Sequence, residues 1–133
     1  MKELSIKNDY WIEKHRYHEL KHFCLQYPIW LKAYCSLTIL QSKPIEEIPK
    51  RADGSSPVER IAEVRDKLFT KMKMVEEACG KTTEYEWDYI LEGVTEGLSY
   101  DVLTAKHGTL PWSRAQYYIL YRKFFYELNK IRD

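Results

Sequence analysis

The segment His18-Glu19-Leu20-Lys21-His22 fits the H-E-x-x-H pattern of zinc peptidases. On a helix, this spacing places two histidines on one face as zinc ligands, with the glutamate beside them as a general base. A catalytic site also needs a third ligand and an open coordination position, and Lys21 would put a cation between the two histidines. His15, Cys24 and glutamates later in the chain are the candidate third ligands. Three ligands from one straight helix do not easily surround a tetrahedral metal, so we interpret this segment as a solvated helix face.

No other signature of an enzyme is present in the sequence. We find no Gly-rich phosphate loop, no nucleophile elbow and no further cluster of carboxylates. We therefore expect a protein that is not an enzyme and that has no cofactor and no catalytic metal. The sequence leaves open whether His15, His18 and His22 bind any metal.

The carboxyl-terminal segment 83–133 has the pattern of a helix-turn-helix unit. Thr83-x-x-Glu86 is a capping box that predicts a helix ending at Gly97, and Ser99 starts a short helix that Gly108 closes. Ser113-x-x-Gln116 predicts the start of a last helix that runs to about residue 131. In trihelical DNA-binding units, the short helix supports a final helix that lies in the major groove.

The last helix has one apolar stripe and one basic side. The predicted buried stripe follows four- and three-residue steps through Tyr117, Tyr121, Phe124, Leu128 and Ile131.

The remaining positions of the last helix supply the candidate DNA contacts. Arg114 in the first turn, with Tyr118, is expected to contact base edges, since Arg can bond guanine in two places. Phosphate contacts are expected from four further basic or hydroxyl side chains, namely Lys106, Ser113, Arg122 and Lys123. Residues 99–133 contain six Lys or Arg and three Asp or Glu, a local charge of +3. The alternative is that these three helices only pack together at the end of the chain and do not bind DNA.

The rest of the chain predicts further helices and nothing that resembles a strand. We expect one helix from about residue 9 to 26, a break at Tyr27-Pro28, and a second apolar helix over 29–41. Residues 42–56 are interpreted as an exposed connector. Ser56-Pro57-x-Glu59 predicts the start of a long helix over 57–80, with Gly80 as its end. The expected fold class is therefore an all-α helical bundle with a carboxyl-terminal trihelical helix-turn-helix.

Composition limits the classes of protein that this chain can belong to. A chain of 133 residues with 44% hydrophobic residues predicts a single domain, and its net charge of +1 shows no global attraction to nucleic acid. The three cysteines form no C-x-x-C pair, and no secretion signal is recognised, which fits a reducing cytoplasm. No apolar run reaches the roughly 18 residues that a membrane span needs, so we expect no membrane association.

Four segments resemble small phage and prophage proteins of Gram-positive bacteria. GVTEGLSYDVL and LPWSRAQYYILYRKFFYELNKI resemble their Gly-(Leu/Val)-(Ser/Thr)-Tyr turn, Pro-x-Ser-(Arg/Lys) helix start and Tyr-rich basic helix. HRYHELKHFCLQYPIW and SPVERIAEVRDKLFTKMKMVEEAC resemble the same group. The group is similar in turn to phage late transcription regulators of the RinA and ArpU kind, whose last helices resemble the promoter-reading domain of sigma factors. The resemblance thus implies that the carboxyl-terminal helix-turn-helix is sigma region 4-like. The resemblance implies a DNA-binding regulator of phage late or packaging genes in the cytoplasm of a bacterial host.

Residue by residue, the helix start of this group falls on Pro111, Ser113 and Arg114, and its basic stretch on Arg122–Lys123. Relatives carry another basic residue in the middle of the last helix, where this chain has Ile119-Leu120. This departure weakens the expectation of strong phosphate contact.

Two other functions fit the same elements. A packaging factor resembling a small terminase subunit would bind DNA through the same unit and form a ring through the 57–80 helix. A helical adaptor without DNA binding would use exposed aromatics such as Trp11 or Trp112. Double-stranded DNA is the expected partner, RNA polymerase is a further candidate, and the 57–80 helix could form a homodimer or pack on the amino-terminal helices. The sequence does not define the target DNA, the direction of regulation or the oligomeric state.

Overall fold

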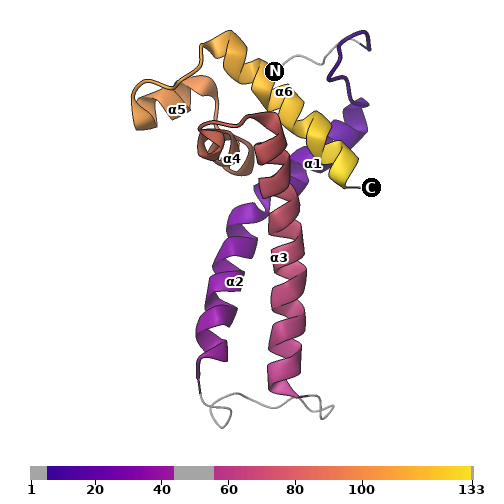
Figure 1. Cartoon of the computed structure of the whole chain (residues 1–133), viewed down its shortest axis with the longest axis vertical. Helices are drawn as coiled ribbons and strands as arrows, with labels where there is room; N and C mark the ends of the chain where they lie inside the picture. The colour runs from indigo at the N-terminus through magenta and orange to yellow at the C-terminus, as the bar shows by residue number, and fades with distance from the viewer. Residues whose placement is uncertain (1–5, 44–55, 133) are drawn as a thin grey trace. The chain divides into compact units, whose positions relative to one another are not determined.

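Every regular element of the computed structural model, which describes residues 6–43 and 56–132, is a helix. The helices are α1 (Lys14–Leu25), α2 (Tyr27–Gln41), α3 (Pro57–Thr82), α4 (Trp87–Glu96), α5 (Tyr100–His107) and α6 (Arg114–Ile131) (Figure 1). The predicted all-α class is thus confirmed for this part of the chain. None of these helices is both long enough and apolar enough to cross a membrane.

Contacts divide the chain into two compact units. The smaller unit is Tyr27–Lys73, which contains α2 and most of α3, and the larger unit is formed by Met1–Gln26 together with Met74–Asp133. The long helix that the sequence predicts over 57–80 contributes to both units. Each unit is described separately below.

The core of the larger unit lies where α1, α4, α5 and α6 meet. α1 packs on α4 and α6, and α4, α5 and α6 contact one another. Side chains with 0–1% exposure come from all of these helices and from the end of α3: Leu20, Cys24, Val75, Ala78, Cys79, Ile90, Val94, Leu103, Tyr117, Phe124, Phe125 and Leu128.

The buried face of α6 is wider than the predicted stripe. Four of the five expected residues are buried and Ile131 is half-buried, and Phe125, which the stripe omitted, is fully buried. The Phe125 ring packs edge-on against Tyr17 of α1, with centroids 5.1 Å apart. A second helix therefore covers a flank of α6 that its own periodicity left exposed.

Most of the predicted helix boundaries are confirmed by side-chain or glycine caps. Ser99 Oγ accepts a hydrogen bond from Val102 N at 3.3 Å, and Ser113 and Gln116 form a reciprocal capping box. Ser56 Oγ accepts from Glu59 N at 3.5 Å at the start of α3. Gly97 ends α4 with φ +67°, in the left-handed region that glycine tolerates best.

Other predicted boundaries are wrong. α1 begins at Lys14 rather than near residue 9, because the Glu13 carboxylate caps it by accepting from Arg16 N. α1 and α2 are separate helices, as expected, but the break lies at Gln26, and Pro28 stands in the first turn of α2. α3 continues through Gly80 to Thr82. The box at Thr83 does not form: Thr83 Oγ1 binds the backbone of Tyr85, and α4 starts at Trp87 after Glu86 with φ 55°.

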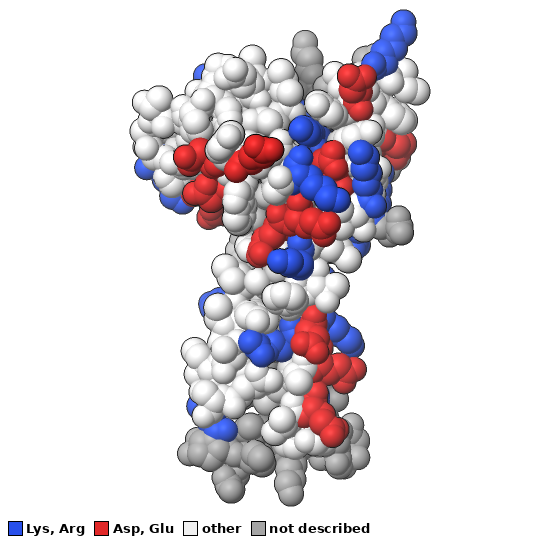
Figure 2. All heavy atoms as spheres, in the orientation of Figure 1, with Lys and Arg blue, Asp and Glu red and all other residues white. Residues whose placement is uncertain are grey.

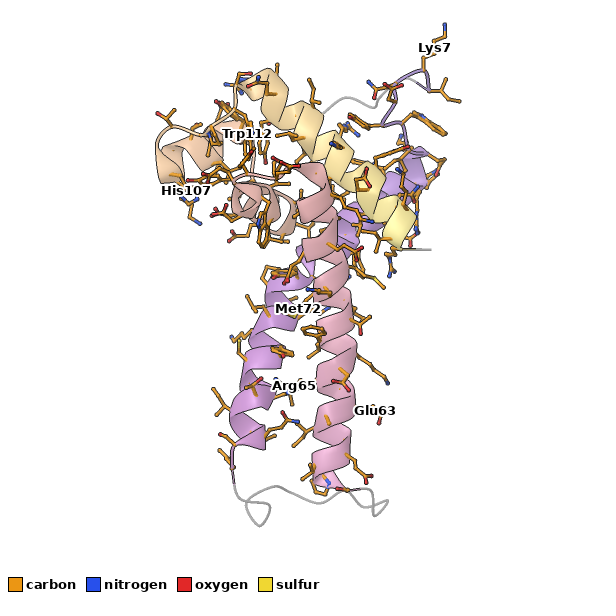
Figure 3. The ribbon with its side chains drawn as sticks, viewed as in Figure 1. Lys7, Glu63, Arg65, Met72, His107 and Trp112 are labelled. Atoms are coloured by element: carbon orange, nitrogen blue, oxygen red, sulfur yellow. The ribbon has the colours of Figure 1, made fainter. Side chains whose placement is uncertain are left out.

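In the smaller unit, α3 reaches α2 mainly through long side chains. Arg65 donates to Tyr34 Oη at 2.9 Å and to Gln41 Oε1 at 2.9 Å, and Figure 3 shows it on the side of α3 that faces α2. Lys71 lies over the Trp30 ring at 5.6 Å. On the side of α2 that carries Trp30, this tryptophan is buried, and the other residues are half-buried, namely Ala33, Tyr34, Leu37, Leu40 and Gln41. Most of the predicted connector, residues 44–55, lies outside the described residues.

Candidate nucleic-acid interface

The first turn of α6 is exposed and firmly capped. Ser113 Oγ accepts from Gln116 N at 3.3 Å, and Gln116 Oε1 accepts from Ser113 N at 3.0 Å. All four residues of 113–116 are exposed. The buried aromatic face of α6 begins at Tyr117, so its first turn is free to present side chains to a ligand.

Arg114 is held at this surface by the neighbouring helix. Its Nη1 and Nη2 donate to the two carboxylate oxygens of Asp101 in α5, at 3.0 and 2.5 Å. The guanidinium also lies 5.3 Å from the centre of the Tyr100 ring. Hydrogen bonds from Arg114 lower the pKa of Asp101, and the same bonds raise the pKa of Arg114. Arg114 and Asp101 nevertheless remain 58% and 68% exposed, so a ligand can reach the pair.

Tyr118 belongs to the same cluster as Arg114 but has a structural role there. Its hydroxyl oxygen accepts a hydrogen bond from Tyr100 N at 3.2 Å, at the start of α5. Tyr100 in turn donates its hydroxyl to Trp112 O at 2.8 Å. These bonds fix the turn between α5 and α6, and they hold Tyr118 half-buried against α5.

Lys106 lies at the end of α5 and is paired with α4. Its ammonium donates to Glu92 Oε1, while His107 Nε2 lies 2.5 Å from Glu92 Oε2 (Figure 3 labels His107). The bond to Glu92 raises the pKa of Lys106. The Lys106 side chain is 52% exposed. Lys106 is therefore accessible, but its charge is already balanced by Glu92.

Arg122, which was expected to face outward or to lie at the edge of the buried stripe and to contact phosphate, is buried instead. Arg122 is only 8% exposed, and its guanidinium carbon lies 4.5 Å from the centre of the Tyr17 ring of α1. Burial under α1 removes this side chain from any surface that a duplex could touch. Lys123, the next residue, is half-buried.

A shallow groove of about 240 Å³ lies beside the exposed turns of α6. It is lined by Thr83, Trp112, Gln116, Ile119 and Leu120. Ile119 is 56% exposed, although it is a large apolar residue. This apolar surface adjoins the cluster formed by Ser113, Arg114 and Tyr118.

Charge on the larger unit is mixed in sign. In the view of Figure 2, acidic and basic side chains are interspersed over this unit, with no broad area of one sign on the face that is shown. Basic and acidic residues of neighbouring helices are partly paired: Arg114 of α6 pairs with Asp101 of α5, and Lys106 of α5 pairs with Glu92 of α4. Any attraction to phosphate is therefore local.

The H-E-x-x-H segment lies within α1, where the Glu19 carboxylate forms ion pairs with two arginines. Its carboxylate lies 2.9 Å from Arg16 Nη1 and 4.0 Å from Arg132 Nη2. His18 and His22 are exposed. Across residues 6–43 and 56–132, no three His, Cys, Asp or Glu side chains are grouped closely enough to hold a metal ion.

The sequence did not identify the acidic partners of the candidate site. In the sequence, Asp101 is only an acid in the first turn of the short helix, and Glu92 is one of several acids in the helix before it. Both pair with residues on another helix, at a separation that no single-helix period describes. Only the Asp101 pair could have been suggested by position. Asp101 lies in the first turn of α5 and Arg114 in the first turn of α6, and the two turns come together where these helices pack.

Comparison of the chain with known protein families, curated proteins and solved structures finds no match.

Proposed function

We propose that the chain binds double-stranded DNA through α4, α5 and α6, arranged as a helix-turn-helix unit, with the first turns of α6 directed at base edges. The observation that carries the proposal is the exposed first turn of α6, where a guanidinium is positioned by Asp101 on the surface of a helix whose other side is an aromatic core. Together with the resemblance of the sequence to sigma-like phage regulators, this supports a role in phage transcription.

The proposed contacts keep five of the six residues expected from the sequence. Arg114 and Tyr118 lie nearest to the bases, and Ser113, Lys106 and Lys123 serve the phosphates. Arg122 is left out because it is buried, and it stabilises the α1–α6 contact instead.

Asp101 would compete with DNA for Arg114, and the free energies of the two contacts determine which partner Arg114 prefers. An exposed ion pair contributes about 0–1 kcal/mol, whereas a two-point Arg–guanine contact discriminates by about 1–3 kcal/mol. A correct base therefore displaces Asp101, and a wrong base leaves Arg114 on Asp101. On this basis the pair acts as a specificity element.

The proposal is tested by fluorescence anisotropy with a labelled duplex of about 30 base pairs, drawn from a selection on random sequences and measured at about 50 mM salt. Arg114→Ala should weaken binding roughly 10–100-fold, corresponding to about 1–3 kcal/mol. Asp101→Asn should tighten binding about fivefold, because it frees Arg114 and removes a negative charge near the phosphates.

Lys67→Ala is the matched control. Lys67 is a 72%-exposed cation in the smaller unit, and its loss removes the same charge without touching α6. Its affinity should stay within about twofold of the wild type. Absence of any anisotropy change with wild-type protein would overturn the proposal, and an equal loss in Lys67→Ala and Arg114→Ala would reduce it to non-specific attraction.

A helical adaptor is the second candidate function, and the groove beside Ile119 favours it. An exposed apolar residue beside Trp112 suits a protein partner better than a phosphate backbone does. RNA polymerase would be such a partner for a regulator. Ile119→Glu should keep the affinity for the duplex within a few fold of the wild type if the groove serves only a protein.

The packaging alternative requires that the protein forms a ring. Light scattering that shows a large defined oligomer would favour it.

A further inference from the structure

α2 is the least polar helix of the described chain, and yet it is poorly covered. Its 15 residues include a single charged side chain, Lys32, and only Tyr27 and Trp30 are buried. A helix that is apolar around its whole circumference is normally buried on all sides. In Figure 2 the surface over α2 is mostly white, which corresponds to uncharged side chains. Another surface is therefore needed to cover α2.

The uncovered side of α2 carries a regular strip. Ile29, Lys32, Ser36 and Ile39 follow three-, four- and three-residue steps and fall within an arc of about 80° at about 100° per residue. We call these four residues the outer strip. Ile29 is 68% exposed and Ile39 is 63% exposed. The outer strip lies opposite Trp30 and Tyr34, the residues that contact α3, and its spacing is that of the seam between packed helices.

The outer strip is self-complementary when it is reversed about Tyr34. Ile29 and Ile39 lie equally far from Tyr34 on its two sides, and so do Lys32 and Ser36. In an antiparallel pair of identical helices, each Ile29 would therefore meet an Ile39, and each Lys32 would meet a Ser36 hydroxyl. A parallel pair would instead place the two Lys32 ammonium groups together, which is unfavourable.

We propose that the outer strip of α2 is a homodimer interface, in which a second copy of this chain packs antiparallel about a two-fold axis. Symmetric association requires one patch that complements itself, and the outer strip meets that condition. The outer strip spans ten residue steps, about 15 Å of helix, so two copies bury less than the roughly 1,200–2,000 Å² of standard interfaces. The association should therefore be weak, with a dissociation constant in the micromolar range.

Sedimentation velocity of the full chain, from about 1 to 200 μM, tests the dimer. The mass should rise from 16.0 kDa toward twice that value with increasing concentration. Ile39→Glu should weaken association at least tenfold, whereas Ile119→Glu, at a 56%-exposed site in the larger unit, should not. Circular dichroism should show that both variants keep their helices, because both sites are exposed. A wild-type monomer at the highest concentration would overturn the proposal.

The register has its own test. Ile29→Glu combined with Ile39→Lys should associate, because each glutamate would meet a lysine of the other copy, whereas Ile29→Glu combined with Ile39→Glu should stay monomeric. Equal behaviour of the two double variants would overturn the antiparallel arrangement.

The reactivity of Cys35 distinguishes whether a second copy or the same chain covers the outer strip of α2. It is the exposed cysteine of α2, beside the outer strip, while Cys24 and Cys79 are buried. The rate of its reaction with a maleimide should fall several-fold as the protein is concentrated. A slow rate that does not change with concentration would mean that the chain covers its own helix, and a fast rate throughout would mean that nothing covers it; either result overturns the proposal. No measurement here involves DNA, so it fails or succeeds independently of the proposed function.

Discussion

Two arginines of α6 have opposite environments, and the difference shows that residues of neighbouring helices determine whether a side chain is exposed or buried. Arg114 is 58% exposed and pairs with Asp101, whereas Arg122 is 8% exposed and lies over the Tyr17 ring. By helical periodicity, Arg122 stands about 120° from the centre of the buried face, which is an edge position. A residue at the edge of a helix's buried face is exposed or buried depending on whether another helix packs beside it. Here α1 covers the edge, and the periodicity of α6 cannot reveal this.

Gly93 of α4 lies so close to Tyr117 of α6 that no side chain fits between them. A Cβ at position 93 would overlap the Tyr117 hydroxyl and lie 3.3 Å from Leu103 Cδ1. Tyr117 is fully buried, and its hydroxyl donates to Leu98 O at 3.3 Å, so it has little room to move. Gly93→Ala should therefore lower the free energy of unfolding by about 1–2 kcal/mol, measured by urea denaturation.

Gly80→Ala is the control for that substitution. Gly80 is also helical, but a Cβ there would meet nothing within 4 Å, so alanine should stabilise the protein by about 0.5–1 kcal/mol. In a Tyr117→Phe background, Gly93→Ala should be less harmful, because the overlapping oxygen is gone. Stabilisation by Gly93→Ala in the wild type would contradict the close contact.

At the scale of the helix, starts and stops were predictable where one side chain completes the cap. Ser99, Ser113 with Gln116, and Gly97 act within a few residues of themselves, so the local sequence contains all the information. Thr83 had the same pattern but bonded to Tyr85 instead, since short polar side chains can satisfy nearby backbone in a turn as well as in a helix. Gly80 lies inside α3, two residues before its end, for a related reason: glycine permits a helix end without requiring one.

The contact between α4 and α5 depends on a carboxylate that should make it sensitive to acid. Partial burial acts to raise the pKa of Glu92, but hydrogen bonds from Lys106 and His107 outweigh that effect and lower the pKa below its ordinary value of 4.5. A carboxyl with a lower pKa in the folded state stabilises the protein above its unfolded pKa, and this stabilisation is lost as the pH falls through the folded value. The free energy of unfolding should therefore fall between about pH 5 and pH 3.

Circular dichroism during urea denaturation at each pH measures this loss. Glu92→Gln should show a smaller decrease over the same pH interval, because the amide does not titrate. Glu84→Gln is the matched control: Glu84 is exposed and forms no ion pair with any described residue, so this variant should follow the wild type. Parallel curves for the wild type and Glu92→Gln would show that Glu92 does not connect the two helices energetically.

At the scale of the whole molecule, the two units differ in how well they bury their own side chains. All twelve of the side chains with 0–1% exposure named above lie in the larger unit. In the smaller unit, the buried side chains Trp30 and Ile61 keep 5% exposure. The sequence predicts a single domain from its length and hydrophobic content, and neither quantity says which helices cover one another. α2 is apolar enough for a core helix, yet the described chain gives it one neighbouring helix within its unit.

Hydrogen exchange should reveal this difference as a difference in local stability. Backbone amides protected by few buried contacts open at low free energy, so amides of α2 should exchange faster than those of α6 in dilute protein. If a second copy covers α2, raising the concentration from about 1 to 200 μM should slow exchange in α2 severalfold and leave α6 unchanged, since association stabilises only the segment that it covers. Ile39→Glu should remove the concentration dependence without altering α6. Exchange in dilute wild-type protein that is equally slow in α2 and α6 would mean that α2 is stable without a partner, and the asymmetry in burial would then have no energetic consequence.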